Sequence, residues 1–422
     1  MKISRAYRTE LDPTNVPRTS LVRHAGTARY AYNWGLSRKE QTYLFNQLPH
    51  PPVKTPTAID LHRELNRLKS TEFPWMYEVS KCAPQEALRN LDAAYQRFFD
   101  CRKGKCALHW NPKTHAPKGK ARCGHPRLKS RKNGLGSFRL TGAIHVEEDH
   151  IVLPRIGGVR LKEHGYLPEG TPCQVTVSER AGRWFVSVAV EEEQSVPAPP
   201  SGEVVGVDLG ISALATVSDG TVFENPRALA HRLRKLQHLQ REVSRKKKGS
   251  HNREKAKCRL SRCHARVADL RKDVLHKATT MLARTKSVVV VESLRPANMV
   301  KNHALAGSIQ DASFGEFVRQ LEYKCRWYGS RLVKADPFYP STKLCSGCGA
   351  LKEMPLSEGT YSCPWCGLVM GRDLNASRNL AMVAASSAET ENACGERSSM
   401  PAMAGASQGI RNPSSTVPVT VV

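Results

Sequence analysis

The hydrophobic pattern before residue 100 is mostly helical. Residues 2–9 alternate between polar and apolar positions, as a strand does, and the turn and capping residues that follow are Asp12, Pro13 and Thr14. Beyond them, apolar residues recur every three or four positions, in the sets Leu21, Ala25, Ala28, Tyr32 and Leu36; Leu61, Leu65 and Leu68; and Leu88, Leu91, Tyr95 and Phe98. This spacing places each set on one helix face, so residues 14–100 are predicted to form a small helical region.

From residue 138 to residue 193 the pattern changes to alternation, which is typical of strands. The segment VTVSERAGRWFVSVAVEE indicates a hairpin that turns near Ala181 and Gly182. This region is expected to build a small β-barrel or sandwich, which the N-terminal strand could complete. Pro and Ser residues at 195–202 then indicate a linker, so a domain boundary is expected there.

The chain beyond the linker has an α/β pattern. Apolar runs predict buried strands at VVGVDLG and TKSVVVVESL, and two further strands are predicted at ISALATVSDG and SRLVKADP. A stretch of helical spacing that KKKGSHN interrupts predicts a helical hairpin, and residues 313–329 predict an amphipathic helix that ends at Gly329. Residues 386–422 show no periodicity and are expected to be a disordered tail.

The positive charge is concentrated in two blocks. The 422 residues include 65 Lys and Arg against 38 Asp and Glu, which gives a net charge of +27. Residues 101–132 hold eleven basic and no acidic residues, and residues 231–272 hold sixteen against three. Such blocks are typical of proteins that bind polyphosphates. The alternative is a pair of solvated helical faces, and a membrane surface is disfavoured because neither block has a broad apolar face.

Three features of the sequence favour a cytoplasmic protein with reduced thiols. No apolar run approaches the length of about 18 residues that a membrane helix needs. The N-terminal segment MKISRAYRTE lacks the apolar core of a secretion signal. The thirteen cysteines are odd in number and are not accompanied by such a signal, so a disulfide framework explains them poorly.

Two Cys-x-x-Cys pairs predict a structural zinc site. The four candidate ligands are Cys345, Cys348, Cys363 and Cys366, with fourteen residues between the pairs and a glycine after each pair. Four thiolates fill the tetrahedral shell of zinc and leave no position for chemistry. Free cysteines or a redox pair are the disfavoured alternatives. An irregular second set, for which metal binding stays open, comprises Cys101, Cys106, His109, Cys123 and His125.

Three acidic residues are candidates for catalysis with magnesium. Asp208 and Glu292 each end a buried strand, where a charge is costly without a partner and where α/β folds place functional groups. Asp373 begins a predicted helix directly after the cysteines. Three carboxylates suffice for two Mg²⁺ ions, which stabilise the attacking and leaving oxygens of phosphodiester cleavage. Each acid alone could instead be a helix cap or a surface residue. Glu316 and Glu322 lie on an amphipathic helix and are expected to be solvated or paired.

Other enzyme classes find little support. The sequence contains no P-loop, no Gly-x-Ser-x-Gly elbow and no HExxH motif, and GVDLG lacks the glycine spacing of a dinucleotide-binding loop. Paired glycosidase carboxylates are compatible with the residue types, yet a net charge of +27 fits a neutral sugar poorly.

Four blocks of the sequence resemble the TnpB family, which insertion sequences of the IS200/IS605 and IS607 types encode and which is related to miniature type V CRISPR effectors. The blocks are GVDLGISALATVSDG, ESLRPANMVKNHALAGSIQDASFGEFVRQLEYKCRWYG, DPFYPSTKLCSGCG and CPWCGLVMGRDLNASRNL. The segments RHAGTARYAYNWGL and PRLKSRKNGLGSFRL are similar to the family too, so the resemblance covers residues 1–385.

The resemblance implies a multidomain fold, with α/β, β-barrel and helical parts and a RuvC-like nuclease domain of RNase H fold that holds an inserted zinc ribbon. The implied parts are the first strand of a wedge β-barrel (1–11), a helical recognition domain with a basic loop (12–135), the wedge β-barrel (136–195), a linker (196–202), the RuvC-like nuclease with a basic helical hairpin (203–344), the zinc ribbon (345–366), the C-terminal part of the nuclease (367–385) and a disordered tail (386–422).

The resemblance also implies an RNA-guided DNA endonuclease that cuts beside a short flanking motif. Its partners would be guide RNA and target DNA, with the transposase of the same element as a further candidate. By motif match, Asp208, Glu292 and Asp373 take the positions of its magnesium-binding catalytic acids, and the four cysteines take those of its zinc ligands. Gly371 replaces the first Asp of a common Asp-Arg-Asp run, but Asp373 is the aligned acid. A guided DNA-binding repressor without cleavage and a conventional transposase or recombinase accessory protein are the alternatives.

Overall fold

In the computed structural model of the protein, the described residues are 2–49, 51–103, 109–111, 116–118, 124–131, 134–193, 195, 197–355 and 358–395. The chain divides into two compact units. The first contains Met1–Pro197 and Arg227–Val274, and the second contains Ala198–Pro226 and Leu275–Val422. The first boundary falls inside the predicted Pro- and Ser-rich linker.

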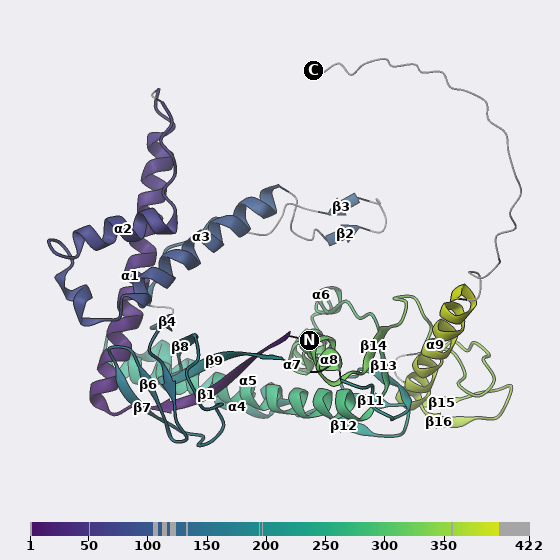
Figure 1. Ribbon diagram of the computed structural model, residues 1–422. Helices are drawn as coiled ribbons and strands as arrows, with labels where there is room; N and C mark the ends of the chain where they lie inside the picture. Colours follow the sequence, from purple (N-terminus) through teal and green to yellow (C-terminus); the bar gives the residue numbers. More distant parts are fainter. Residues whose placement is uncertain are drawn as a thin grey trace, which may run out of the picture. The chain divides into compact units, whose positions relative to one another are not determined.

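The first unit contains the predicted helical region (Figure 1), which comprises α1 (Asn15–Phe45), α2 (Ala58–Leu68), the short 3₁₀ helix η1 (Pro74–Glu78) and α3 (Cys82–Arg102). A capping box explains where α2 begins. Asp60 N–H donates to the Thr57 side chain, and Thr57 N–H donates to the Asp60 carboxylate. The apolar stripe that was predicted for α1 is buried, with Leu21, Ala25 and Ala28 at most 4% exposed.

A seven-stranded antiparallel sheet completes this part of the first unit. Its strands are β1 (Lys2–Asp12), β4 (Ser137–Thr141), β5 (His145–Val146), β6 (His150–Leu153), β7 (Gly157–Leu161), β8 (Gln174–Arg180) and β9 (Arg183–Glu193), in the order β4-β8-β9-β1-β7-β6-β5. A separate pair consists of β2 (His109–Asn111) and β3 (Ala116–Lys118). The N-terminal strand joins the sheet as predicted, but β4 and β5 are its edges, so closure into a barrel stays a prediction.

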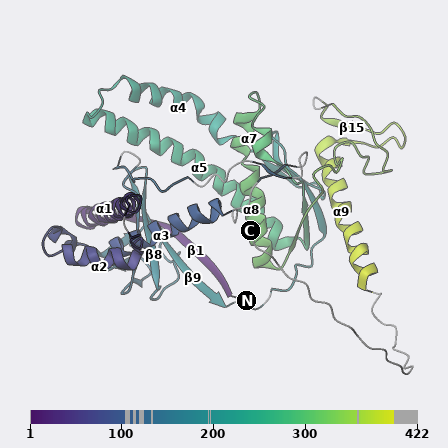
Figure 2. The ribbon, with the colours of Figure 1, turned by 90° about the horizontal axis from the view of Figure 1, so that it is seen from above.

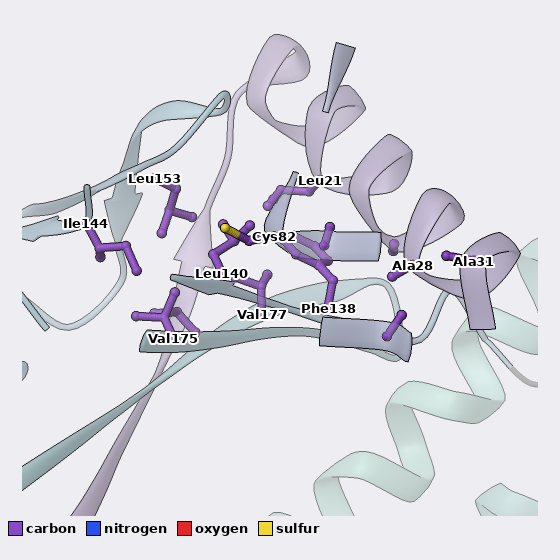
Figure 3. Packing of buried hydrophobic residues seen from close by; sticks show 14 of the residues in the cluster. Leu21, Ala28, Ala31, Cys82, Phe138, Leu140, Ile144, Leu153, Val175 and Val177 are labelled. Carbon is purple, nitrogen blue, oxygen red and sulfur yellow. The ribbon is translucent and has the colours of Figure 1, made fainter. Parts of the chain in front are cut away.

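The helices and the seven-stranded sheet share one apolar core. Figure 3 shows Leu21 and Ala28 of α1 near Phe138, Leu140 and Val177 of the sheet, all in a single buried cluster. The β8–β9 hairpin turns where it was predicted to turn. Both turn residues, Ala181 and Gly182, have positive φ angles of 56° and 78°, which a tight hairpin turn requires.

The predicted basic hairpin consists of α4 (Ala228–Arg245) and α5 (His251–Thr285), which lie side by side (Figure 2). Its facing apolar side chains form a buried cluster that contains Ala228, Leu236, Leu239, Cys263 and Val267. The sequence assigned this hairpin to the nuclease domain, whereas the structure packs residues 227–274 within the first unit. One reason is an ion pair of 2.8 Å between Arg180 Nη1 on β8 and Asp269 Oδ1 on α5, a contact between residues too far apart in sequence to predict.

The second unit is built on a five-stranded mixed sheet. The strand order is β12 (Val222–Glu224), β11 (Ala213–Val217), β10 (Val204–Asp208), β13 (Val288–Val291) and β14 (Arg331–Lys334). Strands β10, β13 and β14 run parallel, while β11 is antiparallel to β10 and to β12. Only β12 was not predicted, because its three residues carry no alternation that could be recognised.

The remaining elements of the second unit follow β13. They are α6 (Pro296–Met299), α7 (Ala306–Ala312), α8 (Phe314–Tyr328), the strand pair β15 (Thr360–Ser362) and β16 (Val369–Gly371), and α9 (Arg372–Gly395). Helix α8 ends at Gly329 as predicted, with a φ angle of 81° at that glycine. Within the described part of the chain, no helix combines the length and the apolar character needed to cross a membrane.

Helix α9 extends further than the sequence indicated. A disordered tail was predicted from residue 386, but the helix continues to Gly395. Its C-terminal half is rich in Ala and contains Glu, both good helix formers, so intrinsic propensity favours the helix where the apolar periodicity is missing. Residues 396–422 of the predicted tail lie outside the described residues.

The close packing of α9 on β10 depends on Gly206. A Cβ atom at this position would lie 1.9 Å from Ser377 O and 2.5 Å from Ala381 N, which are both backbone atoms of α9. Only a residue without a side chain allows the helix to approach the central strand this closely.

We expect Gly206→Ala to lower the free energy of unfolding by about 1–3 kcal/mol or more, because the new methyl group overlaps backbone that cannot move alone. Thermal unfolding followed by circular dichroism measures the effect. Gly307→Ala is the matched control, since a Cβ atom there meets nothing within 4 Å. Equal melting temperatures of the two variants would contradict the close helix–strand contact.

Candidate active site and metal centre

The second unit brings the three candidate acids to one edge of its sheet. Asp208 is the last residue of β10, and Glu292 directly follows β13, the parallel neighbour of β10. Parallel strands end at the same edge, so both carboxylates emerge there. Asp373 is the second residue of α9, which packs on β10. A Cβ atom on Gly210, just after β10, would lie 3.9 Å from Asp373 Oδ2, which places this carboxylate beside the end of the strand.

The electrostatics of Asp208 are consistent with three acids that lie close together. Burial, together with the negative charges of Glu292 and Asp373, raises the pKa of Asp208 to about 8, while Arg372 opposes the shift. Arg372 Nη2 lies 3.1 Å from Asp373 Oδ1. A site that repels its own negative charge in this way must take up a proton or a cation. Carboxylate oxygens are the ligands that Mg²⁺ prefers, so the donor set fits magnesium.

Glu292 has a hydrogen-bond partner that the sequence did not reveal. Ser341 Oγ donates to Glu292 Oε1 at 2.5 Å, and the Ser341 side chain is only 3% exposed. The serine lies in the loop between β14 and the first cysteine pair. A single serine in a loop has no spacing pattern that marks it, so only the folded structure identifies this contact.

The four cysteines converge as the predicted zinc site requires. Their sulfur atoms all lie within 4.8 Å of one another, with 3.6 Å between Cys345 and Cys366 and 3.6 Å between Cys348 and Cys363. Each pair folds into a tight knuckle that ends at a glycine of positive φ, 73° at both Gly349 and Gly367. Among the described residues, this is the set of His, Cys, Asp and Glu that gathers most tightly. The three carboxylates are neighbours but do not converge to that degree.

The chemistry of the thiols also suits a zinc ion. Backbone N–H donation, first from Cys366 and then from Trp365, lowers the pKa of the Cys363 thiol to about 6, while hydrogen bonds with the neighbouring thiols raise the pKa of Cys366 to about 12. A lowered pKa favours the thiolate, which is the form that binds metal. Tyr361 is fully buried beneath the knuckles, and its hydroxyl donates to Lys343 O. Four sulfur donors with no open position fit a closed structural zinc site.

Three family profiles match the chain, in the order of the domains. The profile described as "Helix-turn-helix domain" matches residues 1–46, "Probable transposase" matches residues 187–303, and "Cas12f1-like, TNB domain" matches residues 314–380. The second and third ranges together contain all seven candidate site residues.

Individual relatives match over most of the chain. A Streptomyces pristinaespiralis protein named "Putative RNA-guided DNA endonuclease" is 37% identical over 384 residues, which cover 90% of this chain and 89% of that protein. The chain belongs to the TnpB family. The Escherichia coli (strain K12) protein "Putative RNA-guided DNA endonuclease InsQ" is 31% identical over 398 residues, which cover 90% of this chain and 92% of that protein. The resemblance of the sequence blocks is thus confirmed.

A solved structure also aligns with this TnpB-family chain. It is the "Structure of the mini-RNA-guided endonuclease CRISPR-Cas_phi3", with a TM-score of 0.46 and 10% sequence identity, covering 91% of this chain and 92% of that chain.

The two basic blocks of this TnpB-family chain differ in how far the structure describes them. The second block lies on α4 and α5, where each acid has a basic partner: Arg259 Nη2 lies 2.6 Å from Glu242, Lys257 Nζ lies 2.7 Å from Glu254, and Arg180 holds Asp269. Most of the first block lies outside the described residues. The same holds for Cys106 and Cys123, so the question of a second metal site there stays open.

The two acids that were predicted to be solvated or paired are both paired. Glu316 Oε1 lies 2.7 Å from Arg319 Nη2 on the same helix, and Glu322 Oε1 lies 2.6 Å from Lys334 Nζ on β14. Neither acid therefore competes with the three carboxylates for a place in the candidate site.

We expect the purified protein to contain about one zinc per chain and Cys363→Ser to lose it, because three remaining thiolates leave the tetrahedron open. Elemental analysis by mass spectrometry measures the metal content. Cys173→Ser is the matched control, since Cys173 is exposed and lies outside the cluster. Full zinc content in the Cys363 variant would contradict the assignment.

We expect Asp208→Asn to stabilise the protein in magnesium-free buffer, increasingly so as the pH rises from about 4 to about 8. The raised pKa means that the folded state binds the proton of Asp208 more tightly than the unfolded state. The stabilising contribution of this proton is complete at pH values below the pKa of Asp208 in the unfolded state. It is lost as the pH rises through about 8. Asparagine stays neutral throughout. Melting temperatures at several pH values test this, and a difference that does not change with pH would refute it.

Proposed function

We propose that the protein is an RNA-guided DNA endonuclease of a transposable element, which cleaves DNA by metal-ion-dependent hydrolysis next to a short flanking motif. The arrangement of Asp208, Glu292 and Asp373 at one sheet edge carries this proposal. The names of the two TnpB-family relatives support it, because both describe RNA-guided DNA endonucleases.

The topology of the second unit supports a nuclease of the RuvC-like type. Its central strand β10 has an antiparallel neighbour, β11, on one side and a parallel neighbour, β13, on the other. This mixed order is what the RNase H fold, implied by the resemblance, requires. The acids at the ends of β10 and β13 and at the start of α9 then occupy the catalytic positions of that fold.

In this proposal the three carboxylates hold two Mg²⁺ ions, which supply charge neutralisation and an activated water when bound. The side chains of the protein hold these ions in position. Asp208 would hold the ions together with Glu292 and Asp373, because burial and the charges of both neighbours disfavour its own uncompensated negative charge. The four-cysteine site takes no part in the chemistry and stabilises the segment that precedes α9.

The basic surface of the α4–α5 hairpin is proposed to contact nucleic-acid phosphates. Its acids are engaged in ion pairs with neighbouring basic residues, and the block keeps a large excess of Lys and Arg. Such contacts hold a guide–target duplex by its backbone and carry no sequence information, which base pairing with the guide supplies.

Two other functions are compatible with the family. A guided DNA-binding repressor would bind the same nucleic acids without cutting them, but the intact set of three acids favours cleavage. A conventional transposase or accessory protein would join DNA strands itself, and its products would carry joined ends. Cleaved ends that appear only in the presence of a guide RNA distinguish the proposed function from both.

The test is to express the gene with its flanking DNA, to sequence the RNA that copurifies, and to assay cleavage of DNA that matches its variable end. We expect one abundant RNA and magnesium-dependent cleavage. We expect Asp208→Ala to reduce the cleavage rate by about a thousandfold or more while RNA and target binding stay unchanged.

The matched control is Glu322→Gln. Glu322 is an acidic residue of the same unit that pairs with Lys334 and has no proposed part in catalysis. This variant should cleave at the wild-type rate. Loss of RNA and target binding in Asp208→Ala would refute the division between binding and cleavage. Only random host RNA in the purified protein, released by salt, would refute guided recognition.

A further inference from the structure

We propose that Ser341 is a positioning residue for Glu292, and that Asn375 and Asn379 of α9 hold Ser341 and the first cysteine knuckle in place. This inference rests on the proposed function, because it takes Glu292 as a metal-binding carboxylate. It assigns a role to three buried polar residues that neither chelate zinc nor belong to the acidic triad.

The contact between Ser341 and Glu292 fixes one oxygen of the carboxylate. Ser341 Oγ donates to Oε1 at 2.5 Å, which is a direct hydrogen bond between the hydroxyl and the carboxyl oxygen. A glutamate side chain has three rotatable bonds, so an unrestrained carboxylate loses considerable entropy when a metal ion orders it. With Oε1 held by the serine, Glu292 is already oriented and Oε2 is left for a metal ion.

Ser341 is itself held by α9. Asn379 Nδ2 donates to Ser341 O at 2.7 Å and to Leu344 O at 2.6 Å, and the asparagine is fully buried. The hydroxyl of Tyr339 donates to Asn379 O at 3.0 Å from the same loop. The loop that carries Ser341 is therefore tied to the helix at two points, and the backbone of Ser341 cannot move away from Glu292 without breaking buried hydrogen bonds.

Asn375 ties the first cysteine knuckle to the same helix. Its Nδ2 donates to Leu344 O at 2.7 Å, and its Oδ1 accepts from Ser346 N–H at 2.9 Å. These two peptide groups lie on either side of Cys345. Asn375 is fully buried, and because it precedes Asn379 by four residues the two side chains leave α9 on the same face.

The three residues therefore link the acids to the cysteine site through one short chain of contacts. Helix α9 begins with Asp373 in its first turn, holds the knuckle through Asn375, and holds Ser341 through Asn379. Ser341 in turn holds Glu292. Two of the three candidate acids thus take their positions from the same helix, one directly and one through a serine.

The experiment measures binding of Mn²⁺, a paramagnetic substitute for Mg²⁺, to the full-length zinc-loaded protein by electron paramagnetic resonance. We expect Ser341→Ala to weaken Mn²⁺ binding about ten- to hundredfold, the usual effect of losing a hydrogen bond to a metal ligand. Ser341→Thr, which keeps the hydroxyl, should restore binding to within about threefold of the wild-type protein. The matched control is Ser377→Ala, a buried serine whose hydroxyl donates to Leu374 O of its own helix.

The link through α9 is tested by a double-mutant cycle. Asn375→Ala should also weaken Mn²⁺ binding, although Asn375 does not touch Glu292. The combination with Ser341→Ala should then be less than additive, because both changes release the same carboxylate. Zinc content and far-ultraviolet circular dichroism, measured on every variant, identify any that has lost the knuckle or the fold.

Wild-type Mn²⁺ affinity in Ser341→Ala, or equal losses in Ser341→Ala and Ser377→Ala, would overturn the positioning role. Strictly additive effects in the cycle would overturn the link through Asn375. Cleavage of guided DNA, assayed in parallel, should fall with Mn²⁺ affinity in Ser341→Ala. If the wild-type protein itself fails to cut guided DNA, the proposed function fails, while the Mn²⁺ measurements still decide whether Ser341 positions Glu292.

Discussion

The mutual repulsion of three carboxylates is the constraint on which the second unit depends. A protein with a net charge of +27 holds Asp208 where burial, Glu292 and Asp373 all disfavour its negative charge. Folding can impose such an arrangement only if the elements that carry the acids are fixed by other contacts. The parallel pairing of β10 with β13 fixes two of them, and the approach of α9 to Gly206 on β10 fixes the third. A divalent cation would replace the proton of Asp208 and compensate the negative charges of the three carboxylates.

Helix α9 connects the cysteine site to the acidic site. Helix α9 begins immediately after β16, so the folded cysteine knuckles determine where its first turn lies. Its buried asparagines then bind the peptide groups around Cys345 and the loop before it. A metal ion bound by the cysteines would stabilise more than the knuckles, because the helix that contacts them also holds the loop with Ser341. This explains physically why the cysteine cluster lies directly before the last of the three candidate acids.

Opposite charges are separated between different parts of the chain. The acids of the α4–α5 hairpin are neutralised by neighbouring Arg and Lys residues, so this block presents mainly positive charge. In the triad, the negative charges of Glu292 and Asp373 lie near Asp208, and Arg372 opposes their effect only in part. A polyanion would be attracted to the basic surface and repelled by the triad unless metal ions are bound. In the proposed function, this separation makes binding independent of metal ions and cleavage dependent on them.

The sequence by itself determined the features that local rules govern. The helical stripes, the turn at Ala181 and Gly182, the strands that end at Asp208 and Glu292, and the four cysteines follow from spacing over a few residues. Tertiary structure alone decided the contacts between distant segments: the ion pair of Arg180 with Asp269, the hydrogen bond of Ser341 to Glu292, and the approach of α9 to Gly206. Single polar residues in loops carry no periodicity, so their partners become known only when the chain has folded. The length of α9 was missed for a related reason, since helix propensity extends it without an apolar stripe to mark it.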